Sequence, residues 1–191
     1  MNTEEIKQFI AGDEWHSIAP ELRPSSIKNP DGSIKPFYLR RTFSYLPDDV
    51  FELIILNYAD PLGKVPLAKL FVKGHIEWKG EHPIAENAQK VDFIADKEYT
   101  VTPLHTGFVD LLNAVTKGFN PWIANEAQSI FKKEFPPFGL VDGQVFMEYD
   151  LIYVFGGLMF WGARHVDGRG FDSEENRPTN LQIPLIRNGN H

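Results

Sequence analysis

The sequence predicts a mainly β protein: an antiparallel sheet that curves strongly or closes into a barrel, with a helical insertion at about residues 103–134. Aromatic-rich segments with alternating hydrophobicity follow one another over residues 37–103 and again from about residue 144, with short turns between them. Short connections are typical of antiparallel neighbours, and a sheet of many strands tends to curl or close. Between the two series the hydrophobic spacing becomes helical. An open sandwich is the competing architecture.

The N-terminal part is predicted to contain a short helix at residues 3–10, which Gly12 ends. The barrel-like body is expected from residue 13 onward, and the 191 residues are expected to form a single domain. Residues 23–36, RPSSIKNPDGSIKP, are predicted to be a loop because Pro-Asp-Gly favours a turn.

Four strands are then predicted in quick succession: FYLRRTFSYL (37–46), VFELIILNYA (50–59), LAKLFVKGHIEW (67–78) and QKVDFIADKEYTVTP (89–103). In the third, successive side chains point to opposite faces of the sheet. The interior face is predicted to carry Leu70, Val72, Ile76 and Trp78, and the outer face Lys69, His75 and Glu77.

Within the same strand, Gly74 permits a close approach of another backbone. Lys73 is expected near a loop carboxylate or the mouth of a cavity.

In the insertion, Leu104, Phe108, Leu111, Leu112 and Val115 follow helical spacing and predict an amphipathic helix that ends near residue 118. A second helix is predicted over residues 120–135, with Asn120 as cap and Pro121 in the first turn.

Near the C-terminus, QVFMEYDLIYVF (144–155) and LMFWGARHVD (158–167) predict two strands joined by a hairpin turn at Gly156-Gly157. A polar loop and one last short strand follow.

Composition excludes several classes of protein. A hydrophobic content of 42% with 13% aromatic residues describes a globular chain, and the formal net charge of -7 argues against nucleic-acid binding. The absence of cysteine excludes disulfides and thiolate zinc sites. Without a signal-like leader or an apolar run long enough to cross a membrane, a cytoplasmic location is expected, or an extracytoplasmic one if a leader was removed.

Motifs for cofactor, metal or nucleophile chemistry are not found: there is no H-x-x-x-H, no glycine-rich phosphate loop and no G-x-S-x-G. We therefore expect no cofactor, no metal and no catalytic set. Charged residues do interrupt the apolar strand segments: Arg40, Arg41, Lys69, Lys73, His75 and Arg164. Any of them that points inward needs a partner or an anionic ligand, because an unpaired buried charge is costly.

Five segments from Trp15 almost to Leu185 carry a resemblance to a known family: WHSIAPELRP, FYLRRTFSY, YADPLGKVPLAKLFVKGHIEW, AENAQKVDF with PLHTGFVDLLN, and ENRPTNLQIPL. In this order they resemble the domain of the adenomatosis polyposis coli down-regulated family, membrane-anchored inhibitors of Wnt signalling in animals. The resemblance implies a curved sheet or barrel with a hydrophobic cavity that binds lipid. The chain lacks the family's cysteines, so a stand-alone soluble relative with some other apolar ligand is implied rather than a Wnt inhibitor.

Two functions from different classes are compatible with these features. The first is non-catalytic binding of a fatty acid or similar amphiphile by a carrier or sensor, with six candidate ligand-binding residues: Arg23, Lys73, Trp78, His105, Trp161 and Arg177. The alternative is a barrel-housed isomerase, cyclase or hydrolase for a small hydrophobic substrate. In it His75 or His105 acts as base, and Arg23 or Arg177 stabilises an oxyanion or enolate.

A structural role for the same arginines is a third possibility. In it a salt-bridge network ties two loops together and is formed by Arg23, Asp60, Lys64, Asp92 and Arg177.

Overall fold

The structure, a computed structural model, describes residues 1–187, with the backbone alone at residues 26 and 27. The helices of this part are α1 (Thr3–Ile10) and α2 (Thr106–Val115), with 3-10 turns at Pro136–Phe138 and Glu174–Asn176. Its strands are β1 (Glu14–Ser17), β2 (Glu21–Lys28), β3 (Ile34–Leu46), β4 (Val50–Tyr58), β5 (Pro66–Glu81), β6 (Gln89–Pro103), β7 (Gln128–Ser129), β8 (Met147–Phe155), β9 (Leu158–Trp161) and β10 (Leu185–Arg187).

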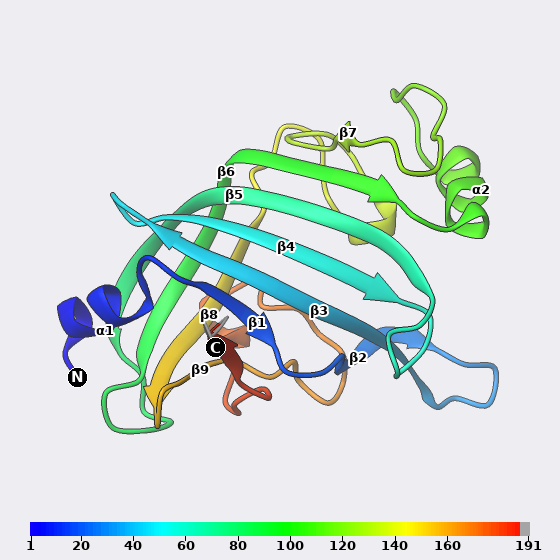
Figure 1. The fold of residues 1–191 in the computed structure, drawn as a ribbon. Helices are drawn as coiled ribbons and strands as arrows, with labels where there is room; N and C mark the ends of the chain where they lie inside the picture. Colours follow the sequence, from blue (N-terminus) through cyan, green and yellow to red (C-terminus); the bar gives the residue numbers. More distant parts are fainter. Residues whose placement is uncertain (188–191) are drawn as a thin grey trace.

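The strands form one antiparallel sheet that closes on itself (Figure 1). The order around the ring is β1-β10-β9-β8-β6-β5-β4-β3, and β3 pairs with β1 again, at Phe43 opposite Trp15. Strand β2 continues along the edge of β3 beyond β1, and β7 pairs with β6. The predicted mainly β class and closed barrel are therefore confirmed.

Strand β5 shows how the alternation is used. Leu70, Val72 and Ile76 are buried, whereas Lys69 and Glu77 are exposed, as the sequence predicts. A Cβ atom on Gly74 would lie 1.8 Å from the main-chain oxygen of Ile94, so only glycine fits there. The register of β5 against β6 shifts at this point, which lets the strand bend around the barrel.

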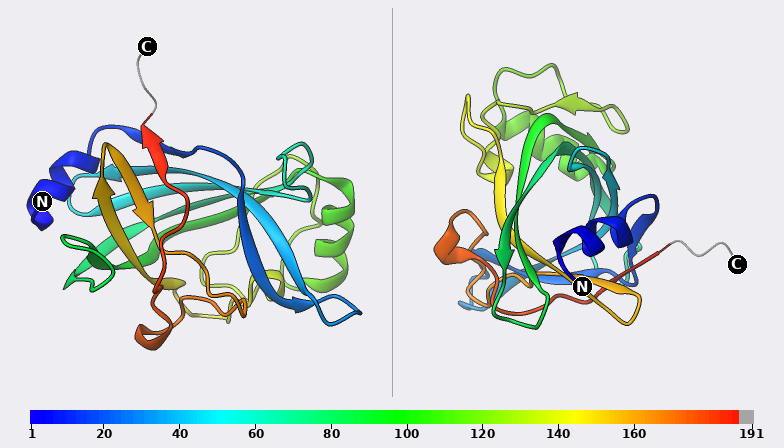
Figure 2. Two further views of the ribbon diagram at one scale, coloured as in Figure 1. Left: turned by 90° about the horizontal axis from the view of Figure 1, so that it is seen from below. Right: turned by 90° about the vertical axis from the view of Figure 1, so that its left-hand side faces the viewer.

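The two helices lie at opposite ends of the barrel (Figures 1 and 2). The predicted N-terminal helix is confirmed as α1, and it begins with a capping box between Asn2 and Glu5. Its apolar face buries Ile6 and Ile10 completely, so α1 closes one end. A membrane-spanning helix is not present: neither helix of residues 1–187 is long and apolar enough to cross a bilayer.

The prediction of a loop over residues 23–36 is wrong for most of that segment. Residues 23–28 belong to β2, which pairs with β3, and residues 34–36 begin β3 itself. The turn is confined to residues 29–33, where the Asn29 main-chain N–H donates to the Ser33 carbonyl at 2.8 Å. An edge strand pairs on one side only, so it tolerates the proline that made this segment resemble a loop.

The second predicted helix, residues 120–135, does not form. The segment instead follows α2 closely: Asn113 accepts a hydrogen bond from the Trp122 main-chain N–H at 2.8 Å and donates to the Trp122 carbonyl at 3.1 Å. The indole N–H of Trp122 donates to Thr116. These tertiary contacts outweigh a weak helical pattern, since short helices are marginal by themselves. The strand predicted over 158–167 also ends early, at Trp161.

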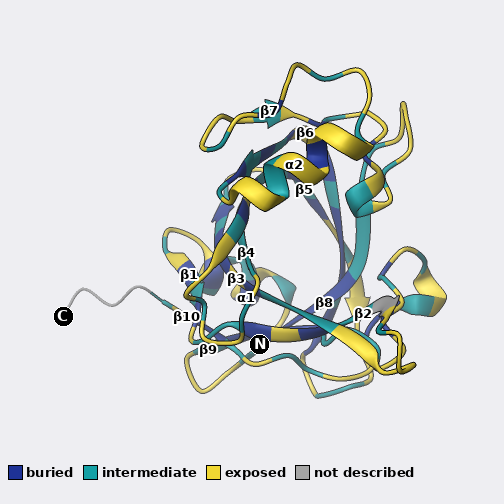
Figure 3. Ribbon diagram, turned by 90° about the vertical axis from the view of Figure 1, so that its right-hand side faces the viewer, coloured by how far each residue is buried: buried dark blue, intermediate teal, exposed yellow. Residues whose placement is uncertain are grey.

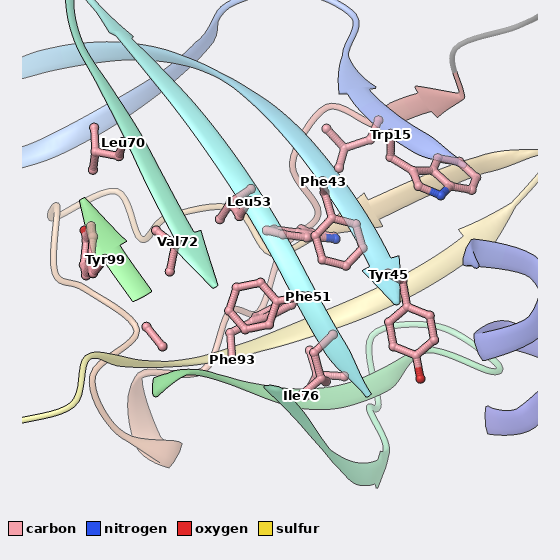
Figure 4. Packing of buried hydrophobic residues seen from close by; sticks show 14 of the residues in the cluster. Trp15, Phe43, Tyr45, Phe51, Leu53, Leu70, Val72, Ile76, Phe93 and Tyr99 are labelled. Carbon is pink, nitrogen blue, oxygen red and sulfur yellow. The ribbon is translucent and has the colours of Figure 1, made fainter. Parts of the chain in front are cut away.

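Aromatic side chains fill the part of the barrel next to α1. The ring of Trp161 lies 4.9 Å from that of Phe43 and 4.6 Å from that of Phe93, measured between centroids. Figure 4 shows Phe43, Phe51 and Phe93 close together, with Leu70, Val72 and Tyr99 farther along the strands. Beyond this cluster, toward α2, the barrel is not filled.

Candidate functional site

A cavity of about 1060 Å³ occupies the α2 side of the barrel. Figure 3 looks along the barrel from that end and shows how the strands surround the interior. The apolar wall comes from three strands, α2 and the segment that follows α2: Phe51, Leu53, Ile55, Leu70, Val72, Phe93, Tyr99, Phe108, Ile130, Phe138 and Phe146. A mostly apolar pocket of this size with a few polar groups is typical of small-molecule sites.

Charged side chains are buried at one part of the wall, on β2 and β3. Arg23 and Arg41 both line the cavity, and both pair with Glu21. Arg41 Nε donates to Glu21 Oε1 at 2.8 Å, and Arg23 Nη2 donates to Oε2 at 3.1 Å. Burial alone would raise the pKa of Glu21, but Arg41 and Arg23 outweigh burial and hold that pKa below its ordinary value.

Arg41 also stacks on Trp161, with its guanidinium carbon 4.3 Å from the ring centroid. Burial lowers the pKa of Arg41 while Glu21 opposes the shift; arginine keeps its charge because its intrinsic pKa is so high. Within the described part of the chain, Arg41 Nη2 and Trp161 Nε1 are buried donors that find no acceptor. Both residues line the cavity, and their two unsatisfied N–H groups are buried within its wall.

Asp150 on β8 lies in the same wall and is 1% exposed. Its Oδ1 accepts hydrogen bonds from the main-chain N–H groups of Leu151 and Gly162, both at 2.8 Å. Burial, with the charge of Glu148 second, raises the pKa of Asp150 to about 7. The carboxyl group therefore exchanges its proton near neutral pH.

Of the six residues selected from the sequence, Arg23 and Trp161 line the cavity and the other four do not. Lys73 lies on the outer face and pairs with Glu52 of the neighbouring strand at 2.6 Å. The carboxylate that it pairs with is thus on a strand rather than in a loop. Trp78 donates its indole N–H to Asp49 near α1, and His105 caps α2 by accepting from the Gly107 N–H.

Arg177 is buried outside the cavity and holds the 174–178 segment against the barrel. Its guanidinium donates to Asp92 at 2.7 Å, to Glu174, and to the main-chain oxygens of Val91 and Asp150. Five donors in a rigid fork suit this clamp, which joins β6, β8 and the loop. Of the salt-bridge network that the sequence suggests, the ion pair between Arg177 and Asp92 is present.

The remaining members of the predicted loop network lie elsewhere. Arg23 pairs with Glu21, while Asp60 accepts hydrogen bonds from the main-chain N–H groups of residues 62, 64 and 65 in its own loop. A single network that joins Arg23 to Arg177 does not form in residues 1–187.

Two residues of the site were not selected from the sequence: Arg41 and Asp150. A signal for Arg41 was present, because alternation in FYLRRTFSYL places Leu39, Arg41, Phe43 and Tyr45 on one face, and all four are buried. Asp150 gave no comparable signal, since both Asp150 and Leu151 are buried and the strand lacks alternation there.

Comparisons with known proteins do not identify a family for this chain. No model of a known protein family matches the chain, and no curated protein sequence matches it either. The resemblance described under Sequence analysis therefore stays a prediction. Across the described residues, no group of three or more His, Asp or Glu side chains is arranged to hold a metal ion.

Proposed function

We propose that the protein binds a fatty acid or a similar amphiphile inside the barrel and acts as a non-catalytic carrier or sensor. The observation that carries the proposal is the cavity of about 1060 Å³, whose wall is apolar along β4, β5 and β6 and cationic where Arg23 and Arg41 are buried. Burial of an alkyl chain against such a wall is favourable by about 25 cal/mol per Å² of apolar surface. The resemblance to the adenomatosis polyposis coli down-regulated domain supports the same binding class.

The proposal is tested by filling the cavity with a side chain. Leu70 points into the cavity, and Phe71, the next residue of β5, lies on the outer face. Leu70→Trp should therefore abolish binding, whereas Phe71→Trp, a matched control on the same strand, should leave it unchanged. The measurement is native mass spectrometry of delipidated protein incubated with dodecanoate, with circular dichroism to verify folding.

A 1:1 complex of the wild type and of Phe71→Trp, lost in Leu70→Trp, supports the proposal. Leu53→Trp on β4 repeats the test from a neighbouring strand and guards against a folding defect peculiar to residue 70. Equal binding by all four proteins, or binding by none, contradicts the proposal.

An enzyme in the same barrel is the second candidate, and one observation favours it. Asp150 lines the cavity with a pKa of about 7, and a general acid–base works best when its pKa is near the working pH. The histidines suggested by the sequence lie outside: His75 contacts Asp96 on the outer face, and His105 caps α2. An enzyme would convert a co-purified ligand into a product on prolonged incubation, which chromatography coupled to mass spectrometry detects for isomers as well. Asp150→Asn would stop the conversion, and an unchanged ligand contradicts this candidate.

A further inference from the structure

Arg41 and Trp161 form one rigid unit at the boundary between the hollow and the filled parts of the barrel. The guanidinium is fixed twice, by the bond from Nε to Glu21 and by the stack on the indole ring. The indole is fixed by Phe43 and Phe93 behind it. Neither donor can therefore swing far to find an acceptor within the protein.

The charged side chains around this unit have an excess of positive charge. Arg23 and Arg41 carry two positive charges, and Glu21, which contacts both, carries one negative charge. Within this group one positive charge is uncompensated, and Glu148 and Arg164, which also line the cavity, add one charge of each sign. Such a site favours a monoanion that also accepts hydrogen bonds.

We infer that the amphiphile enters the barrel head first and that its carboxylate binds to Arg41 Nη2 and Trp161 Nε1, with the alkyl chain directed toward α2. This inference rests on the proposed function and adds the class and the orientation of the ligand. A carboxylate satisfies both buried donors and neutralises the excess charge, while the chain lies along Leu53, Leu70 and Val72.

Asp150 links this binding to pH. The charged groups around it are Glu148 on the same strand, Arg41 on β3, and Arg177, which donates to the Asp150 main-chain oxygen. A bound carboxylate adds negative charge and favours the protonated form of Asp150. Affinity for a carboxylate should therefore fall as the pH rises through about 7, because ionised Asp150 repels the ligand.

The test compares dodecanoate with dodecanol, which has the same chain length and no charge, by isothermal titration calorimetry. Trp161→Phe keeps an aromatic ring and removes the N–H group together with part of the indole, a change that the control variant below reproduces outside the cavity. Replacement of Arg41 is less informative, since it leaves the buried Glu21 short of a partner. Trp78→Phe is the matched control, because it also removes a single indole N–H but outside the cavity.

We expect Trp161→Phe to weaken dodecanoate binding about ten-fold, leave dodecanol binding unchanged, and match the wild type in circular dichroism. Trp78→Phe should bind both ligands as the wild type does. Between pH 6 and pH 8, dodecanoate affinity should fall several-fold in the wild type and stay level in Asp150→Asn, in which Asn can still accept from residues 151 and 162.

An unchanged ratio of dodecanoate to dodecanol affinity in Trp161→Phe overturns the assignment of the head group and leaves the proposed function intact. Absence of binding of either compound to the wild type overturns both.

Discussion

The same four strands, β3 to β6, run through two unlike halves of one barrel (Figures 1 and 4). Near α1 the inward positions carry Trp15, Phe43 and Tyr45, and the helix adds two buried isoleucines. Near α2 the inward positions include Ala68 and Ala95, which line the cavity. Small barrels can be filled entirely by side chains. The contrast therefore teaches that the size of the inward residues, and not the closure of the sheet, decides where a ligand can fit.

The largest expected effect is a difference in unfolding free energy between substitutions in the filled half and substitutions in the hollow half. Phe43→Ala should destabilise the ligand-free protein by about 3–5 kcal/mol, since it opens a void in a filled region. Leu70→Ala should cost less, below about 2 kcal/mol, because the cavity already lies on one side of Leu70. Urea unfolding measures both, with Phe71→Ala as an outer-face control. Equal losses for Phe43→Ala and Leu70→Ala would show that the halves are packed alike.

The second prediction separates a structural arginine from the proposed ligand site. Arg177→Ala removes the bonds to two main-chain oxygens and leaves the buried Asp92 carboxylate with only Lys79 at 3.5 Å, so a loss of about 3 kcal/mol in unfolding free energy is expected. Affinity for dodecanoate should not change in the fraction that folds, because Arg177 does not line the cavity. A stable Arg177→Ala protein with weakened binding would place Arg177 in the ligand site instead.

The smallest expected effect on stability and binding is that of Lys73, which the sequence predicts to lie near a loop carboxylate or the mouth of a cavity. Its ion pair with Glu52 is about one-third exposed on both sides. Exposed pairs of this kind contribute about 0–1 kcal/mol. Lys73→Ala should therefore shift the urea midpoint only slightly and leave dodecanoate affinity as it is. Calorimetry that finds weaker binding would mean that the ligand reaches the outer face of β5.

The sequence predicts those parts of the fold whose signals lie within a few neighbouring residues. Alternation and capping are local, so β5, β6 and α1 follow from the residues themselves. Strand β2 was missed because Pro24 and the turn residues 29–33 dominate the segment, although β2 pairs with β3 directly across that turn. The false helix at 120–135 was likewise overruled by contacts of Trp122 with α2.

The candidate site was harder to predict than the fold. Arg23 and Trp161 were selected and do line the cavity, yet Arg41, which touches both Glu21 and Trp161, was considered only as one of several strand cations. Alternation predicts which face a residue occupies but not which residues of distant strands meet there. Glu21 and Arg41 meet through the pairing of β2 with β3, whereas Asp150 on β8 joins them only when the sheet closes into a ring.

The most direct test of the contrast between the halves is a titration of delipidated protein with dodecanoate, followed by methyl NMR. The expected result is that the methyl signals of Leu53, Ile55, Leu70 and Val72 shift in a saturable way, while those of Ile6 and Ile10 in the filled half do not. Shifts confined to α1 or to the outer face of the strands, or no saturable shift at all, would contradict a ligand site in the hollow half.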